Sequence, residues 1–213
     1  MSDIYIVTAK NFAQFKQRAR KLKQSEKIPH HEALERVAKS LNFENWHQVT
    51  VAAAETEAAE NAHRSGLIIA LDVKDASEYD FGRDGAFVED LRLWRFCEAE
   101  LFDDYRLSKD DDGRTFESTN TKEELLEDFQ NYSTNVILYR YTRNDFPSSV
   151  EDAFDMSRER CFFAPLYVWL KGRFISVFDY SSLINSSFPE PILDTSSKSA
   201  IKRSRWETCR SMM

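Results

Sequence analysis

Apolar residues recur at helical spacing in the first part of the chain and predict two short helices there. Side chains three and four positions apart lie on one face of a helix, so each such stripe marks a face that packs inward. The first stripe consists of Phe12, Phe15, Ala19 and Leu22, and the second of Ala33, Leu34, Val37, Ala38 and Leu41.

Proline and asparagine set the limits of these helices. Ile28-Pro29 separates the two, because a residue before proline disfavours the helical conformation. Asn42 ends the second, since asparagine tolerates the left-handed conformation that commonly follows a helix. A third helix is predicted to open near Glu44-Asn45, with Trp46 facing inward as the plug of a three-helix unit, and to continue through residues 53–64 as a connector.

The rest of the chain mixes strand and helix patterns. Strands are predicted at 67–73 and 136–142 and in an aromatic-rich hairpin over 162–180 that turns at Lys171-Gly172. Helices are predicted at 87–102, after a Thr121-x-x-Glu124 capping box through Phe129, and after Ser148-x-x-Glu151 to about Arg158. Residues 104–118 predict an exposed hairpin of two short polar strands around an Asp-Gly turn.

These patterns predict an α+β fold, with an N-terminal three-helix unit followed by a mixed α+β domain that contains an antiparallel sheet. We expect a helical domain with its connector at 1–64, an α+β domain at 65–192, and a basic, partly flexible tail at 193–213. The strand aromatics alternate as core residues do, and they would suggest a base-stacking platform only if one face of the sheet were exposed.

Apolar runs and cysteines indicate the cellular compartment in which the protein is expected. The longest apolar runs, such as residues 66–71, are too short to span a bilayer, and the first residues lack the pattern of a secretory signal. The three cysteines, Cys97, Cys161 and Cys209, are widely spaced and form no CxxC pair. The cysteines predict free thiols in a reducing cytoplasm. The short apolar runs predict no membrane insertion.

Charge divides the chain into an acidic middle and basic ends. Residues 1–50 carry nine Lys/Arg and five Asp/Glu, and residues 198–213 carry five and one, so each end has a net charge of +4. The residues between them hold 15 bases and 30 acids, a net of −15. The sharpest block is 98–128, with twelve acids and four bases. Such blocks are usually solvated surface, and the alternative is a docking face for a basic partner.

Catalytic and metal motifs are missing from the sequence. It contains no GxGxxG, GxxxxGK[ST], GxSxG or HExxH. The adjacent His30 and His31 point about 100° apart on a helix and suit capping or packing on Trp46 better than metal binding. Asp110–Gly113 reads as a turn, because Thr119 stands where a calcium loop needs glutamate. We expect no catalytic residues, no metal and no cofactor. The alternative is a nuclease-like site built from Asp72, Glu89, Asp90 and Glu100.

The N-terminal stretch resembles a small helical domain that begins many short proteins of bacterial plasmids and other mobile elements, some of them called glyoxalase-related. The shared pattern reads here Ile28-Pro29-His30-His31-Glu32-Ala33-Leu34-Glu35, Ala38, Asn42-Phe43 and Asn45-Trp46, with Asn42 in the place of the usual glycine. The resemblance implies no glyoxalase activity, because that metal chemistry needs a His/Glu set on a β-scaffold that this sequence does not display. It implies an interaction protein of a mobile element.

Three function classes follow. The first is a non-enzymatic protein-interaction factor and, within it, a plasmid fertility-inhibition factor that blocks conjugation by binding the coupling ATPase of a competing plasmid. Its partner would carry a basic surface and meet Asp103, Asp104, Asp110, Asp111 and Asp112. The second is a nucleic-acid accessory protein that binds weakly and without sequence choice through Lys16, Arg20 and Lys23. The third is the nuclease-like enzyme.

Overall fold

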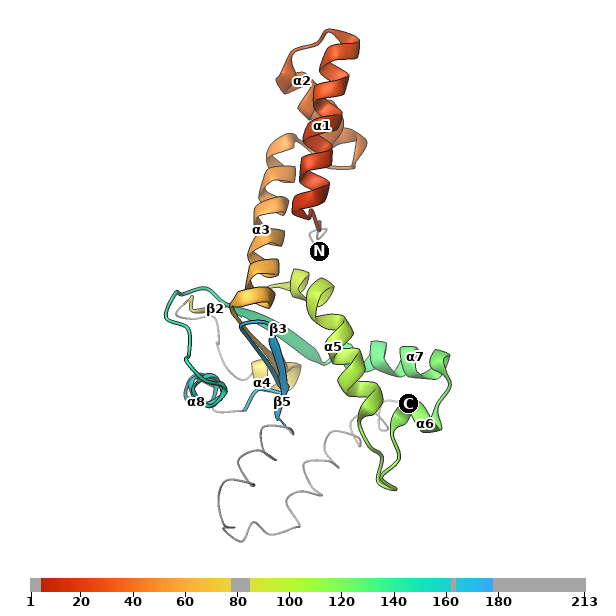
Figure 1. Ribbon diagram of the computed structural model, residues 1–213, viewed down its shortest axis with the longest axis vertical. Coiled ribbons are helices and arrows are strands. Elements are labelled where there is room, and N and C mark those ends of the chain that lie inside the picture. The colour runs from red at the N-terminus through yellow and green to blue at the C-terminus, as the bar shows by residue number, and fades with distance from the viewer. Residues whose placement is uncertain (1–4, 78–84, 162–163, 178–213) are drawn as a thin grey trace.

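The protein consists of a helical arm that projects from an α+β body (Figure 1). The computed structural model describes residues 5–77, 85–161 and 164–177. Helix α3 belongs to both parts: its first half packs in the arm, and its second half lies on the body and runs into the first strand (Figure 1).

The arm is built from α1 (Ala9–Glu26), α2 (His30–Ser40) and the first half of α3 (Trp46–Ser65). The helix limits follow local chemistry. The side chains of Thr8 and Asn45 accept backbone N–H groups at the starts of α1 and α3, and Asn42 takes the predicted left-handed conformation with φ of 65°. Trp46 contacts both apolar clusters of the arm and stacks on Phe12 at 5.7 Å between ring centroids.

The body contains a five-stranded antiparallel sheet in the order β2-β3-β1-β4-β5. Its strands are β1 (Leu67–Asp72), β2 (Phe87–Glu89), β3 (Val136–Tyr141), β4 (Tyr167–Leu170) and β5 (Arg173–Ser176). The central strand β1 is buried on both faces, and its Ala70 pairs with Leu138 on one side and with Tyr167 on the other. The fold class is therefore α+β, as predicted.

Helices cover both faces of the sheet. One face packs against α4 (Val73–Ser77) and α8 (Val150–Cys161) through Ala76, Ala153 and Phe154. The other face packs against the second half of α3, the short 3₁₀ helix η1 (Leu91–Leu93), α5 (Trp94–Leu107) and α7 (Lys122–Ser133), with α6 (Phe116–Thr119) beside α7. Figure 1 shows α8 and the α5–α7 group on opposite sides of the strands.

Two glycines allow the backbone at the end of α3 to lie close to the sheet. At Gly66, which follows the helix, a Cβ would lie 2.9 Å from the Cα of Ala62. At Gly172, in the β4–β5 turn, φ is 78° and a Cβ would lie 2.9 Å from the carbonyl oxygen of Arg64. Both positions exclude larger residues, so the strand turn can close against the last turn of α3.

Most of the predicted elements are confirmed. The three arm helices, the connector, the strands at 67–73 and 136–142, the turn at Lys171-Gly172 and the Thr121–Glu124 capping box are all present. Parts of the 162–180 hairpin and the whole tail at 193–213 lie outside the described residues. The proposed domain boundaries stay a prediction.

Three local predictions were wrong. The helix predicted at 87–102 begins only at Trp94, because Phe87–Glu89 pairs with β3 as an edge strand. The polar hairpin at 104–118 is reduced to a single bridge between Lys109 and Thr115, since α5 continues to Leu107. The cap of α8 lies one residue later than predicted, where Ser149 and Asp152 exchange side-chain-to-backbone hydrogen bonds of 3.1 Å.

Among the residues that the structure describes, the aromatic side chains of the sheet form no stacking platform. Tyr167 and Trp169 are fully buried beneath α3, α5 and α7, and Tyr139 and Tyr141 are buried on the opposite face. Tyr132 and Tyr167 share a buried hydrogen bond of 2.8 Å between their hydroxyl groups. These rings are core residues, because helices cover both faces of the sheet.

Candidate protein-interaction surfaces

The acidic block forms one continuous stretch of the body, which we call the acidic lobe and define as residues 98–128. It comprises most of α5, the following turn, α6 and the first half of α7. Of its four basic residues, Arg106 pairs with Asp103 at 2.8 Å and with Glu117, and Arg114 pairs with Asp112 at 2.9 Å and with Asp110 at 3.3 Å. Half of the lobe's basic side chains are therefore already engaged by acids within it.

In the turn at Asp110–Gly113, the side chain of Asp110 has a structural role. The Asp110 carboxylate accepts the backbone N–H of Arg114 at 2.8 Å, and the Asp110 carbonyl accepts the N–H of Gly113 at 3.0 Å. Gly113 supplies the left-handed conformation that closes the turn, with φ of 79°. Folding alone thus accounts for Asp110, as the predicted turn implies, whereas Asp111 and Asp112 are exposed at the tip.

The other two predicted contact residues lie on α5. Asp103 is exposed and forms an i,i+3 ion pair with Arg106. Asp104 is half-buried, and its backbone carbonyl accepts the Ser108 hydroxyl at 2.8 Å. The surface available to a partner is therefore formed by Asp103, Asp111 and Asp112 more than by Asp104 and Asp110.

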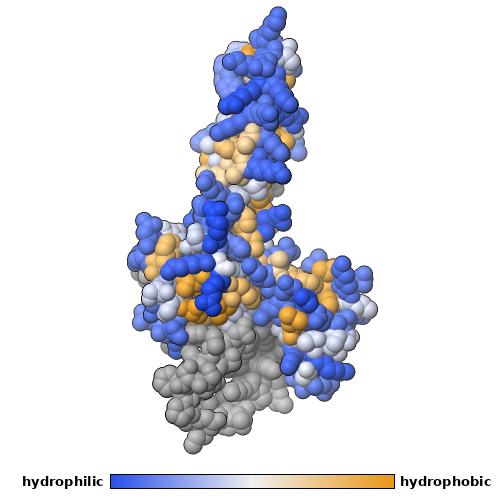
Figure 2. Space-filling view, in the orientation of Figure 1, coloured by the Kyte–Doolittle hydropathy of each residue, from blue (hydrophilic) through white to orange (hydrophobic). Residues whose placement is uncertain are grey.

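The basic residues predicted to meet nucleic acid lie on α1. Lys16, Arg20 and Lys23 are exposed and follow one another at spacings of four and three, so they share one helix face. The Lys16 ammonium also lies 4.1 Å from the centroid of the Phe12 ring. Figure 2 shows that hydrophilic residues cover much of the upper part of the arm.

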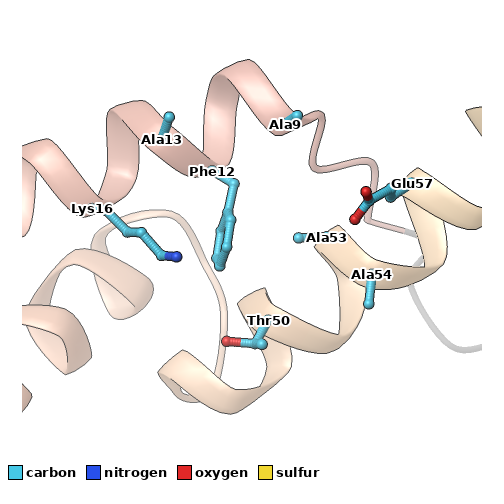
Figure 3. A pocket seen from close by; sticks show the side chains of 8 residues that line it. All are labelled: Ala9, Phe12, Ala13, Lys16, Thr50, Ala53, Ala54 and Glu57. Carbon is cyan, nitrogen blue, oxygen red and sulfur yellow. The ribbon is translucent and has the colours of Figure 1, made fainter.

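A groove, which sequence reasoning missed, opens between α1 and α3 beside these bases (Figure 3). It has a volume of about 280 Å³ and is lined on α1 by Ala9, Phe12, Ala13 and Lys16 and on α3 by Thr50, Ala53, Ala54 and Glu57. Small side chains on both helices leave the space open. The sequence signal was the pair of alanine-rich stretches, but their facing positions depend on the packing of two helices distant in sequence.

The arm is joined to the sheet by a network of charged side chains. Buried Asp90 accepts hydrogen bonds from the side chain of Arg140 at 3.0 Å and from the backbone N–H of Arg92 at 3.1 Å. The Arg92 guanidinium in turn pairs with Glu55 on α3. On the same side of the sheet, Glu100 accepts the Trp169 indole N–H at 3.0 Å and contacts the His63 ring at 3.1 Å.

This network accounts for two of the four acids of the nuclease hypothesis. Asp90 and Glu100 are engaged as described, the Asp72 carboxylate accepts the Lys74 N–H at 2.8 Å, and Glu89 is exposed on β2. Within 5–77, 85–161 and 164–177, no three His, Cys, Asp or Glu side chains are grouped so as to hold a metal ion. Burial and the nearby Glu100 raise the pKa of the Cys97 thiol far above its usual range, which makes this sulfur a poor nucleophile.

The histidines of the opening motif lie at the surface. His30 and His31 are exposed in the first turn of α2, and Pro29 at its N-cap makes no side-chain capping bond. Capping by His31 or its packing on Trp46 stays a prediction. The residue that joins the helices is Glu35, whose carboxylate accepts the backbone N–H of Trp46 at 3.2 Å. The Glu35–Trp46 contact makes this motif a packing unit.

Comparison of the chain with protein-family models, with curated proteins and with solved structures finds no match. The resemblance of the N-terminal stretch to mobile-element proteins thus stays a prediction from its own residues. In the part of the chain that the structure describes, no helix is long and apolar enough to cross a membrane.

Proposed function

We propose that this protein is a non-enzymatic interaction factor whose acidic lobe binds a basic surface of another protein. The observation that carries the proposal is the charge of the lobe: twelve acids face four bases, and two of these bases are already paired within it. A basic partner would relieve the remaining repulsion. It would also associate quickly, because complementary potentials steer the encounter.

The finer form of the proposal concerns the partner. The resemblance of Ile28–Trp46 to mobile-element proteins supports a role in plasmid biology, and within it inhibition of conjugation through the coupling ATPase of a competing plasmid. Small size and an interaction surface separate from the helical arm fit such a factor. The resemblance supports the role in plasmid biology, and the charge of the acidic lobe supports the contact with a basic partner.

The test neutralises the exposed acids and keeps the acid that closes the turn. Asp103→Asn, Asp111→Asn and Asp112→Asn are combined in one variant, while Asp110 is left intact because it caps the turn. We expect binding to the purified cytoplasmic domain of a coupling ATPase to weaken about tenfold, mainly through slower association, as three rim charges of a few tenths to one kcal/mol each would give. Inhibition of plasmid transfer in a mating assay should fall in parallel.

A matched control removes the same charge elsewhere. On α8, Glu151→Gln, Asp155→Asn and Glu159→Gln neutralise three exposed acids, one of which pairs with an arginine at i+3 just as Asp103 does. The control variant should bind and inhibit like the parent. Equal effects of both triple variants would assign the result to net charge alone, and the proposed surface would be wrong.

Weak contact with nucleic acid is the second candidate, favoured by the exposure of Lys16, Arg20 and Lys23 on one helix face. Three phosphate contacts give a salt-dependent but weak and sequence-independent complex. A sub-micromolar, sequence-selective complex with duplex DNA at physiological salt would place this candidate first.

A further inference from the structure

Helix α1 carries a positive charge that the protein itself leaves unpaired. Six of its 18 residues are exposed bases: Lys10, Lys16, Arg18, Arg20, Lys21 and Lys23. The single acid of the helix, Glu26, pairs with Arg36 of α2, and within the described residues no acid pairs with any of the six bases. In the body, by contrast, Arg106, Arg114 and Arg140 are all held in ion pairs. An unpaired surface of this kind favours an anionic partner.

The bases of α1 lie on both sides of a row that is rich in amides. This row consists of exposed residues at alternating spacings of four and three: Lys10, Gln14, Gln17, Lys21 and Gln24. An α-helix turns by about 100° per residue, so Arg18 projects to one side of Gln17 and Lys16 to the other. Arg20 and Lys23 lie on the Lys16 side. The outer face of α1 therefore has glutamines along its centre and cations on both flanks.

We propose that α1 binds in the major groove of duplex DNA, with its glutamines against the base edges and its flanking cations against the phosphates of both strands. The dimensions agree, since a helix with its side chains is about 10–12 Å across and the major groove is about 12 Å wide. The contact extends the nucleic-acid candidate above by a second flank, Arg18, and by the amide row. It does not rest on the acidic lobe.

The position of α1 leaves it open to a duplex. Figure 1 shows α1 running along the arm and away from the body, so its second half, with four of the six bases, lies toward the free end of the arm. The acidic lobe belongs to the body, and charges separated by more than about 8 Å are largely screened at physiological salt. Repulsion of the DNA by the acidic lobe is therefore weak at the free end of the arm.

The amide row distinguishes DNA from other anionic partners. A glutamine side chain can donate to N7 of adenine and accept from its N6 amino group in the major groove. An anionic lipid surface attracts the cations but offers no such base edge, and the deep, narrow major groove of A-form RNA excludes side chains. Duplex DNA therefore uses the cations and the glutamines of α1 together.

A duplex that lacks the adenine N7 acceptor tests the base contact. Fluorescence anisotropy compares binding of the full chain to a labelled A·T-rich duplex and to the same duplex with a deaza-adenine that carries C–H in place of N7. This change leaves the phosphates and the minor groove intact, so a purely electrostatic complex would not respond. We expect the natural duplex to bind at least about fivefold more tightly, the effect of about one good base contact. Equal affinities would overturn the proposal.

Two kinds of variant separate base contacts from phosphate contacts. Gln14→Ala/Gln17→Ala should bind the two duplexes equally and keep the salt dependence of the parent, which four phosphate contacts place at a slope of about −4 in log affinity against log salt. Arg18→Ala should keep the preference for the natural duplex and make this slope shallower by about one. All three side chains are exposed and alanine favours a helix, so these variants keep the arm folded. A parent-like preference in the glutamine variant would show that other residues read the bases, and the proposal would be wrong.

Lys23→Ala and Lys122→Ala form a matched pair. Each removes one exposed lysine from a helix and changes the net charge equally, but Lys23 lies on a flank of α1 and Lys122 on α7 of the body. The first should make the salt slope shallower by about one, and the second should leave it unchanged. Equal effects of the two would assign DNA binding to net charge and overturn the proposal. So would tighter binding to phosphatidylserine vesicles than to the natural duplex at the same salt, since this result would assign α1 to a membrane surface.

Discussion

Asp90 is a buried acid at the junction of arm and sheet, and its removal should be among the most damaging single changes in the molecule. Only 4% of its side chain is exposed, while Arg92 and Arg140 are 20% and 22% exposed. Asp90→Ala therefore leaves two largely buried guanidinium groups without their shared carboxylate and removes the acceptor for the Arg92 N–H. Breaking a buried pair costs about 3–5 kcal/mol, and the partial exposure of both arginines places the expected loss near the lower limit, about 3 kcal/mol.

Urea unfolding followed by circular dichroism measures this loss as a lower midpoint with an unchanged slope. Asp90→Asn is the informative companion, because it keeps one oxygen acceptor and replaces the other with an NH2 donor, so its loss should be smaller than that of Asp90→Ala. A loss below about 1 kcal/mol for Asp90→Ala, the size expected for a surface pair, would refute the reasoning that this network is buried and structural.

Two further predictions concern the arm and the acid response of the body. Trp46→Ala should cost the arm about 2–3 kcal/mol, below the 3–5 kcal/mol of a fully buried aromatic because this ring is only partly buried, and hydrogen exchange of α1–α3 should rise while that of the sheet does not. Bonds from the backbone N–H and the hydroxyl of Thr121 lower the pKa of Glu124. The start of α7 is therefore stabilised above the pKa that Glu124 has in the unfolded chain, and this contribution is lost as the pH falls through the lowered value. The Thr121 amide resonance should report the loss in the parent and stay flat in Glu124→Gln; a flat parent titration would exclude the capping bond as its source.

Sequence alone determined the elements whose signals are local. The helices of the arm follow from apolar stripes limited by Ile28-Pro29 and Asn42, and the start of α7 follows from a capping box completed within four residues. The turn at Gly172 and strand β1 follow in the same way from short, continuous patterns. In each case the interactions that decide the conformation join residues a few positions apart, so the sequence contains them directly.

Only the tertiary structure decided which of these elements meet. Residues 87–89 form a strand because β3, about fifty positions later, offers an edge for pairing, and no local pattern carries that fact. The same holds for Asp90 and Glu100, which the sequence offers as candidate catalytic acids. In the fold they accept hydrogen bonds from Arg140 and Trp169, which lie on strands distant in sequence. The groove likewise exists only because α1 and α3 bring their alanines together. Packing between distant segments fixed these features, and packing depends on the whole fold more than on any one stretch of it.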